Sequence, residues 1–253
     1  MTDRATRGAP RPRRRATVVG VLGELLITAG LLVLAFLGYQ VWLGDVIVGG
    51  QLNEQAVAQG QEWGAGFADV PPAEEGDSDL SEAPPVAVAP GNAERFANLI
   101  IPRFGPDYYR PIAQGVSTTQ VLNKGNIGHY PSTQMPGELG NFALASHRIS
   151  GGGNFHDLHQ LHVGDHIYVE TADGWYQYTF RNLEYVRPTG VGVLSPVPQA
   201  DGVRPAESVI TLTTCNPIFT TAERIIAYGV FDSFYPRAGG VPAEIVSNVQ
   251  GAA

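Results

Sequence analysis

The sequence of 253 residues contains one cysteine, Cys215, and cannot form a disulfide bond within the chain. This excludes a small disulfide-stapled scaffold and, in an extracytoplasmic protein, leaves a thiol that is either intermolecular or reactive. Charged residues make up only 16 % of the chain, and no basic stripe interleaved with aromatic residues occurs, so nucleic acid is not an expected partner. The sequence also lacks an internal repeat of fixed period and a long apolar segment near its C-terminus, which argues against a repeat architecture and a second membrane helix.

Charge is also absent from residues 25–43, and this gap separates two regions of opposite charge. Residues 1–24 carry six Arg against two acidic residues, a balance of +4, whereas residues 44–253 carry ten basic and 22 acidic side chains, a balance of −12. A helix over 25–43 is roughly 28 Å long at about 1.5 Å per residue, which matches the hydrocarbon core of a bilayer. The Arg-rich flank predicts a cytoplasmic N-terminus, and Tyr39 and Trp42 suit the opposite interface.

The sequence therefore predicts a single-pass protein of the cell membrane, with residues 1–16 as a cytoplasmic tail, 17–43 as a transmembrane signal anchor and the rest of the chain extracytoplasmic. A cleaved signal peptide is the alternative. The apolar run exceeds the usual length of roughly 7–15 residues, and the first Ala-x-Ala triplet, residues 56–58, lies too far downstream for a cleavage site. An uncleaved anchor is favoured.

Residues 44–91 predict a flexible acidic and Pro-rich linker. The stretch DVPPAEEGDSDLSEAPPVAVAP has too little apolar surface to offset the entropy of ordering the chain. Such a linker sets how far the domain can move from the membrane and has no catalytic role. We therefore expect that removal of residues 1–90 abolishes surface attachment in cells but leaves soluble activity intact.

Residues 92–253 predict one all-β catalytic domain. Apolar residues recur at every second position on both sides of Asp173-Gly174, which is a strong hairpin signal. Further strands are expected at FANLIIPRF, NFALASHRI, SVITLTTC and RIIAYGVF. About 160 residues of this kind form a single sandwich or closed barrel.

The run SVITLTTC places Cys215 at the C-terminal end of a strand, because the Asn-Pro pair that follows ends the ladder. A reversal centred between Phe219 and Thr220 sets Cys215 directly opposite Arg224 on the next antiparallel strand. A guanidinium within about 4 to 6 Å favours the thiolate and can also stabilise an oxyanion. The alternative, a buried structural thiol beside an unrelated surface arginine, is weakened by the strand-end position and the extracytoplasmic setting.

A nucleophilic thiol needs a proton acceptor, for which histidine is the obvious candidate. The chain contains His129, His147, His156, His159, His162 and His166. His147 is favoured because it ends an apolar run just before SGGGN, where a strand fixes the side chain and a loop admits substrate. A metal site in HDLHQLHVGDH is the alternative, but no thiolate completes it and the stretch is polar, so solvated histidines are favoured. We expect no metal and no cofactor.

The motifs ALASHR and TLTTC, with Arg224 nine positions after the cysteine, resemble the signature of the sortases, the membrane-anchored cysteine transpeptidases of Gram-positive bacteria. The family pattern is a His on one strand, Thr-Leu-x-Thr-Cys on another and an Arg on the next, which maps onto His147, Cys215 and Arg224. The stretch GHYPSTQMPGELGNFALASHR is similar to class E sortases of actinobacteria, although Ser146 stands where Gly commonly precedes the His. The resemblance implies an eight-stranded β-barrel with short helices and catalysis by these three residues.

The resemblance also implies the substrates. Cys215 would cleave an LPxTG-like or LAxTG-like C-terminal sorting signal between Thr and Gly, and a peptidoglycan amine would resolve the thioacyl intermediate. Tyr130, Thr214 and Asn216 are the expected substrate-binding residues, and residues 188–208 are expected to form a long loop beside the site. Two alternatives stay open, a pilin-polymerising sortase and a non-catalytic wall-binding barrel.

Overall fold

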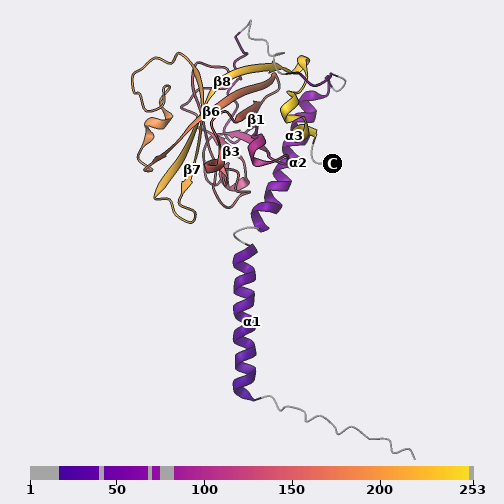
Figure 1. Cartoon of the computed structure of the whole chain (residues 1–253), viewed down its shortest axis with the longest axis vertical. Coiled ribbons are helices and arrows are strands. Elements are labelled where there is room, and N and C mark those ends of the chain that lie inside the picture. The colour runs from indigo at the N-terminus through magenta and orange to yellow at the C-terminus, as the bar shows by residue number, and fades with distance from the viewer. Residues whose placement is uncertain (1–16, 40–42, 68–69, 75–82, 251–253) are drawn as a thin grey trace, which may run out of the picture. The chain divides into compact units, whose positions relative to one another are not determined.

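The computed structural model describes residues 17–39, 43–67, 70–74 and 83–250 of the chain. The chain divides into two compact units, residues 1–40 and 41–253, which are drawn in Figure 1. The predicted cytoplasmic tail 1–16 and the predicted interfacial Trp42 lie outside the described residues.

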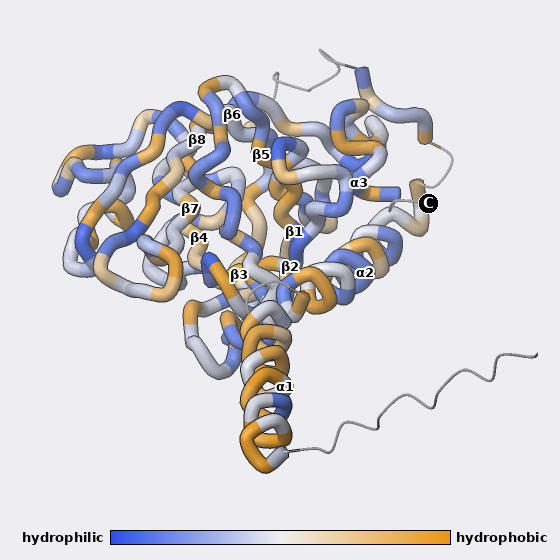
Figure 2. The backbone as a smooth tube through the Cα atoms, turned by 60° about the horizontal axis from the view of Figure 1, so that its bottom comes forward, coloured by the Kyte–Doolittle hydropathy of each residue, from blue (hydrophilic) through white to orange (hydrophobic). Residues whose placement is uncertain are grey.

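In its described part, the first unit is one helix, α1 (Val18–Gly38). The side chain of Thr17 caps it by accepting a hydrogen bond from the N–H of Gly20 (3.2 Å). None of its residues is buried, and Figure 2 shows hydrophobic residues along most of its length. α1 is long and apolar enough to cross a membrane, and it begins seven residues before the charge-free run, so Glu24 lies within it.

The second unit contains a closed barrel of eight described strands, which confirms the predicted fold class. The strands are β1 (Arg95–Ile100), β2 (Tyr109–Gln114), β3 (Ile127–His129), β4 (Gly140–Ala145), β5 (His166–Glu170), β6 (Gly174–Val186), β7 (Ser208–Asn216) and β8 (Glu223–Pro236). Their order around the barrel is β1-β2-β3-β4-β7-β8-β6-β5, and β1 pairs with β5 to close it. The pairs β2 with β3 and β4 with β7 are parallel, whereas the others are antiparallel.

The barrel core follows the period of two that the sequence predicts. Tyr176, Tyr178 and Phe180 of β6 and Ile167 and Val169 of β5 all lie in the main buried cluster, and the two strands form the predicted hairpin. On the central strands, the core takes Phe142 and Leu144 from β4, Ile210 and Leu212 from β7, and Ile225 and Ala227 from β8. The alternate residues of β4, β7 and β8 therefore face the outside of the barrel.

Two strands, β2 and β3, were not among the predicted runs. β2 contains Arg110 and Pro111, which interrupt its apolar pattern, and β3 has only three residues. The connections also contain short 3₁₀ helices. Of these, η3 (Leu122–Lys124) precedes β3, and η5 (Val191–Leu194) follows β6. A short helix, α3 (Val246–Gln250), follows β8.

The linker prediction is wrong for residues 44–64, which form the helix α2 (Gly44–Gly64) within the barrel unit. Leu52, Ala56 and Gly60 recur every four residues and are buried, so one face of α2 packs on the barrel beside β2 (Figures 1 and 2). This face consists mainly of small residues, which add little apolar surface. The sequence of this segment therefore gives no sign that it packs. The end of the predicted linker is also held, because the backbone carbonyl of Pro85 accepts a hydrogen bond from Tyr176 (2.6 Å).

Candidate active site

Cys215 lies on the outer face of β7, next to the end of the strand. It is directly opposite Arg224 of β8 in the antiparallel register, as the sequence predicts. Thr211 and Thr213 precede Cys215 on the same outer face, because Ile210 and Leu212 between them point into the core. The thiol is partly exposed and free.

Two hydrogen bonds connect the segment around His147 to the end of β7. β4 and β7 run parallel, and their register ends with Ala145 beside Thr213, which lie two residues before His147 and Cys215. On one side of the pair, the Thr214 hydroxyl donates to the carbonyl oxygen of Ser146 (2.9 Å). On the other side, Arg148 donates to the side-chain oxygen of Asn216. The residues on either side of His147 are therefore tied to the residues on either side of Cys215.

The imidazole of His147 is oriented by Asn123 in η3. Its Nε2 lies 2.9 Å from Asn123 Oδ1. Because that oxygen can only accept, the neutral ring carries its proton on Nε2 and keeps the Nδ1 lone pair free to accept a proton. Burial lowers the pKa of His147, and the negative charge of Asp45 on α2 opposes that shift. The ring is therefore mainly neutral at pH 7 and able to act as a base.

The guanidinium of Arg224 is fixed by the turn that joins β7 and β8. Its Nη1 donates to the carbonyl oxygens of Thr221 (3.1 Å) and Glu223 (2.8 Å). Within the described part of the chain, these are its only hydrogen bonds, so Nε and Nη2 retain N–H groups for a ligand.

The three predicted substrate-binding residues have different surroundings. Tyr130 places its hydroxyl 3.2 Å from Thr213 Oγ1, on the same outer face as Cys215. Thr214 is buried, and its side chain is used in the bond to β4. Asn216 accepts from Arg148 and donates to Glu223 (3.0 Å), so its amide joins three segments around the site. Of the three, Tyr130 is the one whose hydroxyl contacts the outer face of β7 at Thr213.

The long connection between β6 and β7, for which residues 188–208 were expected beside the site, is bound to β4. The side chain of Asn141 on β4 donates to the carbonyl oxygens of Val193 (2.9 Å) and Ser195 (3.1 Å) in this connection. The hydroxyl of Thr211 holds the same amide from β7 (2.6 Å). This connection is thus anchored on the outer face that carries Cys215, at the level of Thr211, four residues before Cys215 on β7.

The remaining histidines are not part of the site. His129 is buried in the barrel wall, between Gln114 (2.6 Å) and Gln134 (3.0 Å). His156, His159 and His162 are exposed, and His166 pairs with Glu244 (2.6 Å). Among the residues that the structure describes, no cluster of three or more potential ligands could hold a metal ion.

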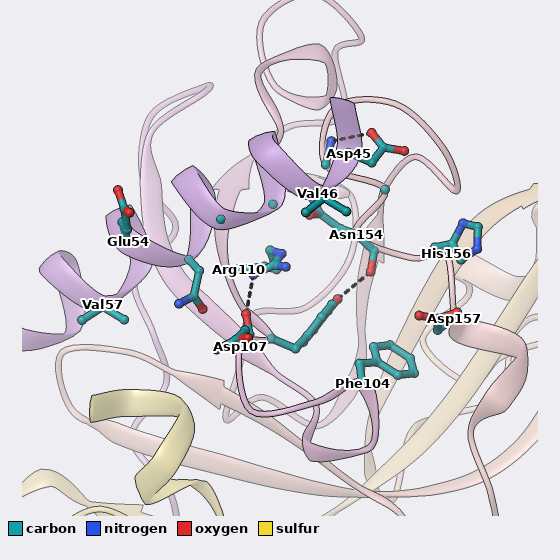
Figure 3. Close-up of a pocket in the computed structure, with 16 residues that line it drawn as sticks. Asp45, Val46, Glu54, Val57, Phe104, Asp107, Arg110, Asn154, His156 and Asp157 are labelled. Carbon is teal, nitrogen blue, oxygen red and sulfur yellow. Dashed lines mark hydrogen bonds between the residues drawn. The ribbon is translucent and has the colours of Figure 1, made fainter. Parts of the chain in front are cut away.

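Two residues near His147 were missed by sequence reasoning. Asn123 belongs to no motif, and Asp45 falls in the segment that was expected to be a linker. Asp45 accepts hydrogen bonds from the loop that follows His147, at one rim of a cavity of about 830 Å³ under α2 (Figure 3). Neither Cys215, His147 nor Arg224 lines that cavity.

Comparisons with known proteins point to one family. A model of the sortase domain matches residues 99–232. The curated sortase SrtE1 of Streptomyces coelicolor is 36 % identical over 245 residues, which cover 94 % of this chain and 64 % of the relative. Sortase SrtE2 of the same organism is 32 % identical over 88 % of this chain and 86 % of its own length. The chain thus spans less than two thirds of the first relative and most of the second.

A solved structure agrees with this result. The crystal structure of sortase E1 from Streptomyces coelicolor with a tripeptide in the active site has 40 % sequence identity and a TM-score of 0.57. The match covers 63 % of this chain and all of the solved chain.

Proposed function

Because this chain belongs to the sortase family of cysteine transpeptidases, we propose that it cleaves a C-terminal sorting signal and joins the shortened protein to an amine. The single observation that carries the proposal is the placement of Cys215 on β7, opposite Arg224 of β8 and between two residues that bind the neighbours of His147 in the chain. The thiol supplies a nucleophile, the imidazole a base and acid, and the guanidinium a cation for developing negative charge.

In the first half of the reaction, the sulfur of Cys215 attacks the carbonyl carbon of the Thr-Gly bond in an LPxTG-like or LAxTG-like signal. The thiol proton moves to His147, and the carbonyl oxygen becomes an oxyanion. His147 then gives the proton to the departing glycine amine, the C–N bond breaks, and a thioester remains on Cys215. The free Nδ1 of a neutral ring supports this role, since only an unprotonated ring can accept the proton.

Arg224 stabilises the oxyanion through the N–H groups on Nε and Nη2. Its bonds to the carbonyl oxygens of the β7–β8 turn hold the guanidinium before substrate arrives, so little reorganisation is needed in the transition state.

In the second half, an incoming amine attacks the thioester carbon and transfers its proton to His147 as the C–N bond forms and the C–S bond breaks. The proposed acceptor is a peptidoglycan amine. Tyr130 and the β6–β7 connection contact the sorting signal and set its preferred sequence, which is supported by their positions on the outer face that carries Cys215.

The location follows from α1. In the proposed topology this helix spans the cell membrane, the Arg-rich segment before it stays in the cytoplasm, and the barrel lies outside, where secreted substrates and wall precursors meet.

Thioester trapping tests the proposal. The full chain in detergent micelles is incubated with LPxTG and LAxTG peptides and then with hydroxylamine, and mass spectrometry follows the peptide hydroxamate. We expect hydroxamate from the wild-type chain and none from Cys215→Ala.

Two results would contradict the transpeptidase assignment in different ways. Peptide binding without hydroxamate indicates a non-catalytic wall-binding barrel. Hydroxamate that also forms with Cys215→Ala shows that another group carries the acyl chain. If the wild type is active, it is then offered a stem-peptide amine and a protein lysine as acceptors. Transfer to the stem peptide indicates wall anchoring, and transfer to the lysine indicates pilin polymerisation.

A further inference from the structure

The helix α2 is seated on the barrel by specific contacts along its C-terminal half. Asn98 of β1 donates to the carbonyl oxygen of Ala56 (3.4 Å). Gly60 lies so close to the hydroxyl of Tyr109 that a side chain would not fit there. The position of α2 is therefore fixed by the fold rather than by its connection to α1.

The N-terminal end of α2 reaches the loop that follows His147. Asp45 Oδ2 accepts a hydrogen bond from the N–H of Ser150 (2.8 Å), and Oδ1 accepts one from Gly152 (3.1 Å). Figure 3 shows the carboxylate of Asp45 turned toward this loop, with the bond to the loop drawn. The loop follows β4 in the sequence. Asp45, which binds it, lies more than one hundred positions earlier in the chain.

The loop has few features of its own that restrict its conformation. Residues 150–153 all have positive φ angles, of 71°, 59°, 90° and 53°. Three of the four are glycines, which reach such angles without strain but are the most flexible residues when unrestrained. Inside the loop, one backbone bond, from Gly153 to Ser150 (3.0 Å), closes the turn.

Leu52 connects the same helix to the other support of the histidine. A Cβ atom built on either Gly125 or Gly152 would lie 2.8 Å from a methyl group of Leu52, so this side chain touches both loops. Gly125 follows Asn123, the partner of His147, by two residues. α2 thus contacts both segments that orient the imidazole.

We propose that Asp45 is a positioning residue for His147: by binding the backbone of Ser150 and Gly152, it fixes the loop and with it the ring that exchanges protons with Cys215. This inference rests on the proposed transpeptidase function. It makes α2 a working part of the catalytic unit, in contrast to the expectation that residues 44–90 only tether it.

The proposal has an electrostatic consequence that a purely structural role lacks. Burial lowers the pKa of His147, whereas the negative charge of Asp45 raises it. The other charged or titratable groups on the segments around His147 are Cys215 on β7, Arg224 on β8, Lys124 in η3, and Arg148, which follows His147 and binds Asn216. Removal of the Asp45 charge takes away a force that favours the imidazolium, so the pKa of His147 falls further.

The test uses the full chain in detergent micelles and the LPxTG and LAxTG peptides. The variants are Asp45→Ala, Asp45→Asn and Asp45→Glu, with Glu54→Gln as the matched control, since Glu54 is an exposed carboxylate on the same helix and has no hydrogen bond among the described residues. Thermal unfolding of each variant shows whether it is folded.

For Asp45→Ala we expect kcat to fall about tenfold with peptide KM unchanged, because a small displacement of a catalytic group costs rate rather than binding. The acid limb of the kcat/KM profile should move to lower pH in Asp45→Ala and Asp45→Asn, and Asp45→Glu should restore part of the rate. Hydrogen exchange at the amides of Ser150 and Gly152 should become faster in Asp45→Ala and stay unchanged in Glu54→Gln.

The failures of the two proposals are distinguishable. If the wild-type chain forms no hydroxamate, the transpeptidase function is wrong, and the exchange measurement still reports whether Asp45 holds the loop. If the wild-type chain is active and folded Asp45→Ala keeps its kcat and its acid limb, Asp45 has no positioning role.

Discussion

Arg148 donates a hydrogen bond to the side-chain oxygen of Asn216, which ties the residue after His147 to the residue after Cys215. Thr214 makes the corresponding bond to Ser146 on the other side of the pair. The two proposed catalytic residues are 68 positions apart in the sequence, and these paired bonds join the residues that flank them.

The first prediction concerns Asn216, which also donates to Glu223 of β8. Asn216→Ala removes both side-chain contacts. We expect kcat for thioester formation to fall about tenfold while peptide KM stays within twofold of wild type, because the change affects the placement of the reacting groups. A rise in KM at constant kcat would show instead that Asn216 binds the substrate, as the sequence suggested.

The second prediction concerns Arg224. Arg224→Ala removes the cation proposed to stabilise the oxyanion, so kcat should fall by about 10² to 10³, the range seen when one such donor is lost. Arg224→Lys keeps the charge but not the planar donor geometry and should recover only part of the rate. Steady-state kinetics with saturating peptide measure both, and a fully active Arg224→Ala variant would exclude Arg224 from the mechanism.

The third prediction is a loss of stability in acid that originates at His129. Burial lowers the pKa of this ring to about 4, while the unfolded chain has the ordinary value of 6.5. The unfolded state therefore binds the proton first, so folding stability is full above pH 6.5 and decreases as the pH falls toward 4. The loss approaches about 3 kcal/mol, from about 1.4 kcal/mol per pKa unit.

Thermal unfolding of the full chain in detergent between pH 7.5 and about 4 tests this prediction, with His129→Gln as the comparison. The variant lacks the titrating ring, so its midpoint should decrease less over the same interval. Parallel curves for the two proteins would assign the acid sensitivity to other groups.

The fourth prediction concerns the seat of α2. Gly60→Leu forces a side chain into the hydroxyl of Tyr109 and the carboxylate of Glu170, whose oxygens lie 3.1 and 3.2 Å from the position of the new Cβ. We expect α2 to leave the barrel and become sensitive to protease. Gly50→Leu is the matched control, because a Cβ at this glycine of the same helix meets nothing within 4 Å. Equal protease resistance of the two variants would show that α2 does not depend on this contact.

The sequence predicts those parts of the fold that depend on local patterns. Alternation of apolar residues identifies β5 and β6, short apolar runs identify β1, β4, β7 and β8, and the Asp-Gly turn identifies the hairpin between β5 and β6. β2 and β3 have weak patterns of their own and acquire their strand character by pairing with neighbours. Helix α2 was missed because its buried face is made of small residues, whose packing depends on a barrel surface shaped to receive them.

By itself, the sequence determined the apolar helix α1, six of the eight barrel strands and the three candidate reactive groups, because a hydrophobic period, a charge-free run and a short motif are each contained within a few consecutive residues. Only the tertiary structure decided what surrounds the reactive groups. Asn123 meets His147 across 24 positions, and Asp45 meets the histidine loop across 105 and 107 positions. Contacts between such distant segments arise from how strands and helices pack in three dimensions, and no local pattern encodes them.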